Sequence, residues 1–265
     1  MLGAIIGDIV GSRFERSSDK TKDFDFFDEY CRFTDDSLMT MAVGCALADS
    51  SPDNEEAFKS SLRENMRVLG RMYPDAGYGG SFYVWLWGET DKAYGSFGNG
   101  SGMRVSPVAW AGNTIEEVRR LARWSAEITH DHPEGIKGAE AIASAVFLAR
   151  TGKTKEEIRE YIEENFYDLN FTLDEIRPFY SFDVTCQGSC PQAIMCFLEG
   201  EDFEDTVRNA VSLGGDCDTI GAMAGAIAEA YFGIPAEIEE EGLSYLDEYL
   251  TDIYFGYSAA LYGNN

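Results

Sequence analysis

Small residues crowd one stretch near the C-terminal end of the sequence, and this stretch limits the possible folds more than any other. Between Thr219 and Phe232 the small residues include Gly221, Ala222, Ala224, Gly225, Ala226 and Ala228. Side chains of so little bulk allow a neighbouring backbone to approach very closely. The stretch therefore predicts a buried helix at the centre of the fold.

Helix signals recur from about residue 36 to the C-terminus and predict a mainly α-helical chain. Three segments pair a capping hydroxyl with a carboxylate three residues later: Thr114–Glu117, Thr154–Glu157 and Thr172–Glu175. Residues 137–150 predict a further helix, and residues 191–199 predict one that opens on Pro191. The run Ile5–Val10 is best interpreted as a strand, although an apolar run of this kind also suits a buried helix.

The bulk composition favours one compact domain over residues 1–265, because 45% hydrophobic residues are enough for a continuous core. The N-terminal segment lacks the features of a signal peptide, and no apolar run has the length of a membrane span. The six cysteines are irregularly spaced, so we expect them to be reduced. We therefore expect a soluble, cytoplasmic and monomeric protein without a membrane partner.

The formal net charge of −26 argues against nucleic acid as a partner, because binding to a phosphate backbone depends on Lys and Arg. The same charge opposes any phosphate-bearing substrate unless bound cations neutralise part of it at the site. The charge therefore points to metal ions.

Two acidic clusters each stand before a helix. They comprise Thr34, Asp35 and Asp36, and Asp216, Asp218 and Thr219. Helix capping is the simpler explanation, since short oxygen-bearing side chains satisfy the free N–H groups of a first turn. A cap needs only one acceptor, however, whereas two carboxylates and a hydroxyl repel one another until a cation binds. Oxygen ligands favour Mg²⁺ or Mn²⁺ over zinc, and two such ions roughly 3.5–4 Å apart would activate water for hydrolysis.

Two further segments carry weaker signals. The glycine-rich residues 95–102 offer N–H groups that can hold phosphate oxygens, although a flexible turn is an equally good interpretation. Residues 129–133 contain both histidines, His130 and His132, whose spacing is wrong for a shared helix face. His130 either belongs to the polar segment that ends a helix or donates a hydrogen bond to a phosphate or ribose. Near the N-terminus, Asp8 and Glu15 stand beside glycines, as in a solvated turn.

Five segments taken together resemble the ADP-ribosylglycohydrolases. They are residues 7–15, 33–39, 95–107, 129–139 and 211–233, and the likeness extends over nearly the whole chain. The resemblance implies a compact all-α fold, a single orthogonal helical bundle with a dinuclear site for two divalent cations, Mg²⁺ or Mn²⁺. It implies metal ligation by Thr34, Asp35, Asp36, Asp216, Asp218 and Thr219. It also implies that Gly95, Ser96, Phe97, Asn99 and His130 contact ADP-ribose, and that Glu15 has a catalytic or gating role.

The resulting hypothesis is a hydrolase that cleaves ADP-ribose from a modified protein side chain, with arginine as the expected linkage and serine as the other. Glu15, Asp35 and Asp36 are the candidate catalytic acids, with no ranking among them. One alternative is a phosphatase with Asp216 as aspartyl nucleophile, although that motif normally ends a strand early in its domain. Another is a protein that binds ADP-ribose or has a structural role and lacks activity.

Overall fold

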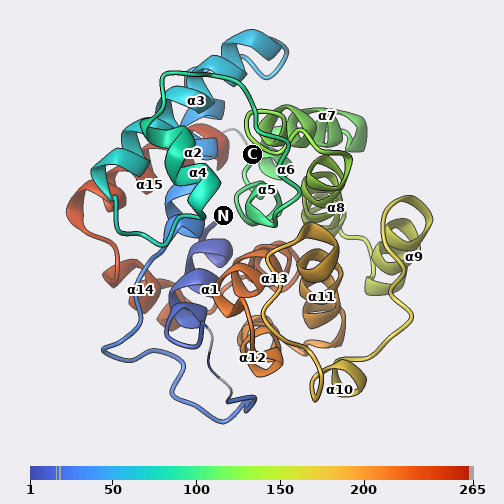
Figure 1. Ribbon diagram of the computed structural model, residues 1–265. Helices are drawn as coiled ribbons and strands as arrows, with labels where there is room; N and C mark the ends of the chain where they lie inside the picture. The colour runs from blue at the N-terminus through green and yellow to red at the C-terminus, as the bar shows by residue number, and fades with distance from the viewer. Residues whose placement is uncertain (16, 18, 263–265) are drawn as a thin grey trace.

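The computed structural model describes residues 1–262 apart from 16 and 18, and its regular elements are helices (Figure 1). Within these residues the structure contains no strand, and the prediction of an all-α fold is confirmed. The helices are α1 (Leu2–Ser12), α2 (Asp35–Asp49), α3 (Glu55–Met72), α4 (Gly80–Trp87), α5 (Gly100–Met103), α6 (Val108–Ala111), α7 (Ile115–Ala126), α8 (Pro133–Arg150), α9 (Lys155–Asn165), α10 (Leu173–Ile176), α11 (Cys186–Glu199), α12 (Phe203–Leu213), α13 (Cys217–Phe232), α14 (Ala236–Ser244) and α15 (Glu248–Tyr262).

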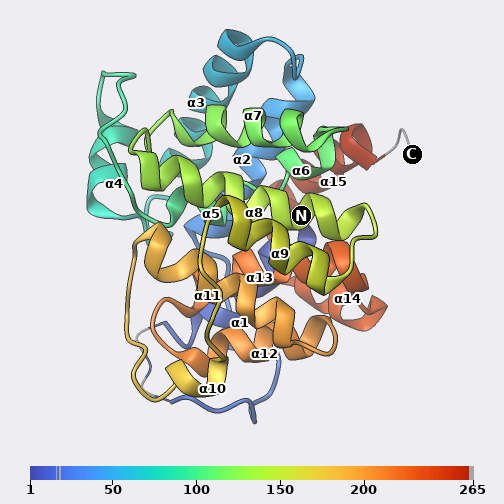
Figure 2. The same ribbon diagram turned by 90° about the vertical axis from the view of Figure 1, so that its right-hand side faces the viewer.

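Helix α13 lies at the centre of the molecule, as its small residues predicted. It packs against α1, α8, α11 and α12, and its residues from Cys217 to Ala228 are all buried. In Figure 2, α7 and α8 lie on one side of α13 and α12 lies on the other, while α10 lies at the edge of the fold. Within the described residues, no helix combines the length and the apolarity that crossing a membrane requires.

The closest helix packing joins α1 to α13 through glycines. Gly3 lies opposite Gly225 and Gly7 opposite Gly221, so the two helices run antiparallel. A β-carbon at Gly7 would lie only 2.0 Å from the carbonyl oxygen of Gly221, which leaves no space for any side chain. This contact fixes the position of α1 relative to the first turn of α13.

The preferred interpretation of Ile5–Val10 as a strand is wrong, because these residues belong to α1. Every residue of α1 is buried. A helix that is covered on all sides needs no polar face, so its sequence lacks the 3.6-residue periodicity that identifies a surface helix.

The predicted helix starts are correct where a local capping signal exists. Complete capping boxes begin α9 at Thr154 and α10 at Thr172. Thr114 caps α7 by accepting from the backbone of Glu117, but the Glu117 carboxylate accepts from the backbone N–H of Asn113 instead of Thr114.

Two predicted starts are too late. Helix α8 begins at Pro133, and His132 is its N-cap through Nδ1, which accepts from the Glu134 N–H at 3.1 Å. Helix α11 begins at Cys186 after the cap residue Thr185, so Pro191 lies inside the helix. The cap at Thr185 has no carboxylate three residues later, which left the start of α11 without a recognisable signal.

Candidate metal and substrate site

A cavity of about 500 Å³ lies where the first turns of α2 and α13 meet. Ten of the residues predicted to act at the site line it: Glu15, Thr34, Asp35, Asp36, Ser96, Asn99, His130, Asp216, Asp218 and Thr219. The two acidic clusters, which are far apart in the sequence, therefore face the same space. Gly95 and Phe97 are absent from the lining. Phe97 is 46% exposed, and its ring packs against His132 with 5.3 Å between centroids.

Asp8 is the buried acid that sequence reasoning missed, because it was interpreted as part of a solvated turn. It lies on α1, and its carboxylate accepts four hydrogen bonds from the first turn of α2. The donors are the N–H and hydroxyl of Thr34, at 2.9 and 2.6 Å, and the N–H and hydroxyl of Ser37. These donors use the usual acceptor capacity of a carboxylate. Asp8 thus holds the end of α2 in place, and its neighbour Gly7 was the signal that this part of the chain is closely packed.

Thr34 is the N-cap of α2, so the capping interpretation is correct for this residue. Its hydroxyl accepts from the Asp36 N–H at 3.3 Å and donates to Asp8. The Asp36 carboxylate plays no capping role. Its Oδ2 accepts from Thr219 Oγ1 at 3.2 Å, whereas its Oδ1 is buried and has no hydrogen-bond partner among the residues that the structure describes.

The second cluster also does more than cap a helix. Asp216 is the N-cap residue of α13 but makes no side-chain capping bond, and its Oδ2 accepts from Asn99 Nδ2 at 2.6 Å. Asp218 Oδ1 accepts from the Thr219 N–H at 3.0 Å. Helix α12, and no strand, precedes Asp216 in the structure, which is unlike the setting of an aspartyl nucleophile that ends a strand.

Burial and mutual repulsion raise the pKa values of three carboxyls around the cavity. Desolvation and then the charge of Asp8 raise the pKa of Asp35 to about 8. Desolvation first, followed by neighbouring carboxylates, also raises the pKa of Asp36 and of Asp218 well above the ordinary range. Carboxyls of Asp8, Asp36 and Asp218 each have an oxygen within 4.8 Å of the others. Carboxyls packed this closely in a buried place either take up protons or bind a cation.

The donor set fits a hard divalent cation. The Oδ1 of Asp36, which has no partner among the described residues, offers a ready ligand atom, and the side chains of both acidic clusters offer only oxygens. The Thr34 hydroxyl donates its proton to Asp8 and accepts from the Asp36 N–H, which leaves one lone pair of its oxygen for a cation. Asp8 itself is a poorer ligand, since its oxygens are already engaged, and it is better described as a support for Thr34.

The glycine-rich segment is joined to both the acidic cluster and α11. The Asn99 N–H donates to the Val184 carbonyl at 2.8 Å, beside an isolated bridge between Gly98 and Thr185. The Cys186 thiol donates to the Gly98 carbonyl at 3.0 Å, and all six cysteines are free, as expected. The segment is therefore held in a defined conformation beside the cavity.

His130 lies at the cavity wall as a neutral imidazole. Desolvation, and secondly the positive charge of Arg104, lower its pKa well below the ordinary value. Its Nδ1 lies 2.7 Å from Thr129 Oγ1, which already accepts from Arg104 at 3.0 Å. This arrangement favours a proton on Nε2, the nitrogen that faces Gly100. Arg104, a buried lining residue, was not predicted, and only its place after the glycine-rich segment could have indicated it.

Comparisons with known proteins found a matching family model, similar sequences and a similar solved structure. The model of the family described as ADP-ribosylglycohydrolase matches residues 1–260. ADP-ribosylhydrolase ARH3 of Mus musculus is 29% identical, over 88% of this chain and 83% of its own length. The ADP-ribosyl-[dinitrogen reductase] glycohydrolase of Rhodospirillum rubrum is 28% identical, over 82% of this chain and 74% of its own. A solved structure titled ADP-ribosylglycohydrolase-related protein complex superposes with a TM-score of 0.64 at 26% identity, covering 99% of this chain and 96% of that one.

Proposed function

Because the chain belongs to the ADP-ribosylglycohydrolase family, we propose that it is a metal-dependent hydrolase that releases ADP-ribose from a modified protein side chain. The observation that carries this proposal is the set of buried carboxylates at the cavity, with Asp36 Oδ1 lacking any partner. The cavity of about 500 Å³ lies in the range of small-molecule sites.

Two divalent cations, Mg²⁺ or Mn²⁺, would be held by Thr34, Asp35, Asp36, Asp216, Asp218 and Thr219. When bound, such ions polarise oxygen ligands and lower the pKa of a water molecule. They would also lower the raised pKa values of Asp35, Asp36 and Asp218, so that these carboxyls ionise.

The glycine-rich segment and His130 supply neutral donors to an anionic diphosphate in an otherwise acidic cavity. Asn99 is held between Ser189 and Asp216, so it links the segment to the metal ligands. The neutral His130 can donate from Nε2 without carrying a charge of its own. Ser96 lines the cavity beside it, and we propose that Gly95 and Phe97 act at its outer edge.

Glu15 is our proposed proton-transfer group among the three candidate acids. Asp35 and Asp36 are assigned as metal ligands, whereas Glu15 lines the cavity from the segment that follows α1. Its charge contributes to the raised pKa of Asp35 and of Asp218, so its carboxylate interacts with both acidic clusters across the cavity.

Arginine is the linkage that we propose, because of the two carboxylates that line the cavity besides the metal ligands, Glu15 and Asp75. The lining also contains Arg32 and Arg104, but the Arg104 guanidinium is already bound to the Gly100 and Ser125 carbonyls and to Thr129. A guanidinium on the substrate carries a positive charge that Glu15 and Asp75 attract, whereas an O-glycosidic linkage to serine carries none.

The proposal is tested by supplying ADP-ribosyl-arginine and ADP-ribosyl-serine peptides with Mg²⁺, with Mn²⁺ and with a chelator. We expect release of ADP-ribose with either metal, faster from arginine, and none with the chelator. Faster release from the serine peptide would overturn the assignment of arginine as the linkage but would leave the proposed hydrolase function intact. No metal-dependent release from either peptide would overturn the function.

A further inference from the structure

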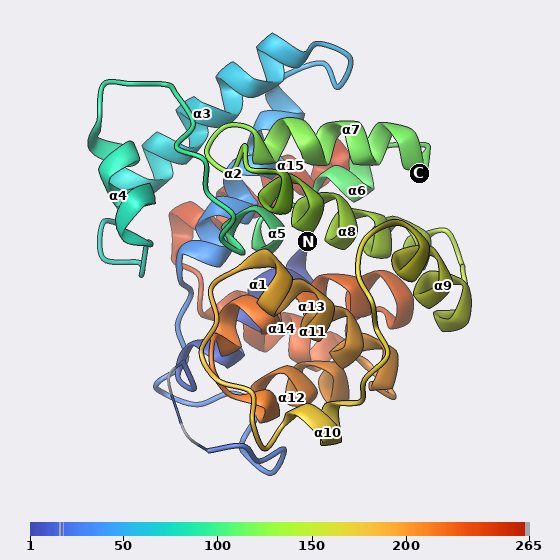
Figure 3. The ribbon, with the colours of Figure 1, turned by 45° about the vertical axis from the view of Figure 1, so that its right-hand side comes forward.

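The segment between α1 and α2 carries Glu15 and has neither a helix nor a strand among its described residues. In Figure 3 it runs below α12 on its way to α2. Such a segment has no hydrogen-bonding ladder of its own, so its position depends on the side chains that hold it. The question is which residue fixes it close to Glu15.

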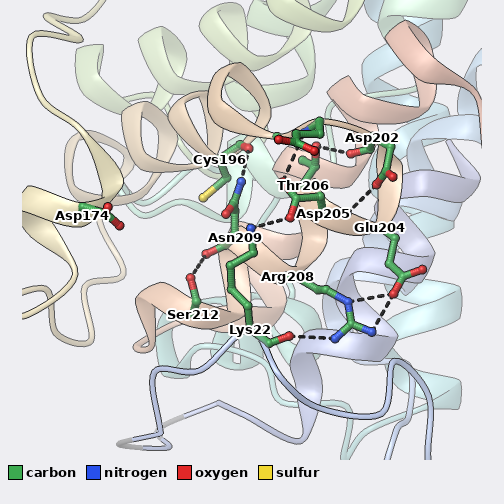
Figure 4. Close-up of polar contacts among 12 residues, drawn as sticks. Lys22, Asp174, Cys196, Asp202, Glu204, Asp205, Thr206, Arg208, Asn209 and Ser212 are labelled. Carbon is green, nitrogen blue, oxygen red and sulfur yellow. Dashed lines mark hydrogen bonds and ion pairs between the residues drawn. The ribbon is translucent and has the colours of Figure 1, made fainter.

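Arg208 on α12 makes the densest set of contacts with this segment. Its Nη1 donates to the carbonyl oxygens of Lys22 and Phe24, at 2.9 and 2.7 Å. Its Nε donates to Glu204 at 2.7 Å, and Nη2 forms an ion pair with the same carboxylate at 2.6 Å. Figure 4 shows Arg208 between Glu204 on one side and the Lys22 carbonyl on the other. Glu204 therefore fixes the plane of the guanidinium, and the guanidinium fixes the backbone.

Aromatic contacts extend this anchor towards Glu15. The guanidinium of Arg208 lies over the ring of Phe24, 4.7 Å from its centroid. Phe24 packs against Phe14 with 4.7 Å between centroids, and Phe14 is the residue directly before Glu15. A continuous line of contacts thus leads from α12 to the residue beside the cavity.

Other side chains also hold the segment. Lys22 pairs with Asp205, but its side chain is 41% exposed, and exposed ion pairs contribute little. Lys20 donates to the carbonyls of Arg177 and Tyr180, which are parts of another loop, at 2.5 and 2.6 Å. Arg13 at the end of α1 also lies over Phe14, 4.5 Å from its centroid, so the aromatic pair is held from α1 by Arg13 and from α12 by Arg208.

We propose that Arg208 is a positioning residue for Glu15, acting through Phe24 and Phe14 from outside the cavity. The inference rests on the proposed function of Glu15. It requires arginine, because a planar fork reaches two carbonyls and a carboxylate at once and a lysine ammonium does not. A small displacement of a proton-transfer group misaligns it with the reacting bond and lowers kcat. The groups that bind the substrate stay in place, so KM changes little.

The first test is a double-mutant cycle on ADP-ribose release with R208M and E15Q. We expect R208M to lower kcat roughly ten- to a hundredfold with little change in KM, and R208K to recover part of this loss. In the E15Q background R208M should cause almost no further loss, because both changes remove the same contribution.

The matched control is R150M. Arg150, at the end of α8, donates to the carbonyls of Trp110 and Gly112 at the end of α6, at 3.1 and 2.8 Å, and packs over aromatic rings as Arg208 does. R150M should lose about as much stability as R208M does, but it should keep the kcat of the native enzyme. An equal loss of kcat in R150M would mean that Arg208 acts through general stability, which would overturn the proposal.

The second test does not depend on activity. Trypsin cleavage after Lys20 and Lys22, followed by mass spectrometry, should become roughly tenfold faster in R208M than in the native protein or in R150M, because the segment opens more often. Native cleavage rates in R208M would overturn the proposal. So would an E15Q enzyme of native activity, or a loss from R208M that is as large in E15Q as in the native enzyme. If the native enzyme releases no ADP-ribose, the proposed function fails, and the trypsin rates alone decide whether Arg208 holds the segment.

Discussion

The side-chain amide of Asn99 donates to Asp216 Oδ2 at 2.6 Å and so connects the glycine-rich segment to the second acidic cluster. Asn99 is 7% exposed, and its amide also donates to Ser189 Oγ at 3.1 Å. A substrate contact on the segment and the position of a proposed metal ligand therefore depend on one side chain.

Asn99→Asp should be more harmful than Asn99→Ala, because a carboxylate at this position repels Asp216 instead of donating to it. We expect kcat/KM to fall about tenfold or more in the alanine variant and further in the aspartate variant. Activity measured across a Mn²⁺ titration would separate lost metal affinity from lost turnover. An aspartate variant with higher activity than the alanine variant would contradict this account.

Asp36→Asn should remove activity by at least about a hundredfold while leaving the helices folded. Without metal, the variant should melt no lower than the native protein, because one of several buried like charges is gone. Native protein should gain melting temperature when Mn²⁺ is added, and the variant should not. Thermal melts with Mn²⁺ and with chelator give both results, and an equal metal-induced gain in the variant would show that Asp36 is not a ligand.

Asp8→Ala should destabilise the protein although Asp8 is not assigned as a ligand. The change leaves the buried N–H and hydroxyl donors of Thr34 and Ser37 without their acceptor, at a cost of about 2–4 kcal/mol. Urea unfolding would measure this loss. The variant should also need more metal for half-maximal activity, because Thr34 is no longer held. Unchanged unfolding would mean that water replaces the carboxylate.

Gly7→Ala should be among the most damaging single-methyl changes in the chain, because its β-carbon would overlap the Gly221 carbonyl. We expect a loss of several kcal/mol or failure to fold. Gly256→Ala is the matched control: it lies in α15 with nothing within 4 Å of a new β-carbon, and it should be neutral or stabilising by about 0.5–1 kcal/mol. Similar melting temperatures for the two variants would contradict the described packing.

Local signals account for most of the fold that could be predicted from the sequence. A capping hydroxyl and its carboxylate lie within one turn, so the starts of α9 and α10 were recognisable. The start of α11 was not, because Thr185 caps it without an acidic partner. Helix α1 was missed because burial on all sides removes the periodicity that identifies a helix.

The features of the site were likewise predictable only where their signal is local in the sequence. Each acidic cluster was visible as an excess of carboxylates before a helix, but their meeting at one cavity depends on how α2 and α13 pack, which the local pattern does not contain. Asp8 was missed because its partners lie on a different helix. Arg104 and Arg208 were missed for the same reason, since both act through contacts with distant backbone.

The glycine contact between α1 and α13 also indicates where this scaffold can be altered. Asp8 follows Gly7 directly, and Asp218 lies in the first turn of the helix that Gly7 touches, so substitutions along this contact would shift the acids as well as the core. An engineer who wishes to change which modified protein is accepted should keep these two helices intact. Phe182 and Val184 form cavity wall outside both helices and outside the glycine-rich segment, and a library of variants belongs there.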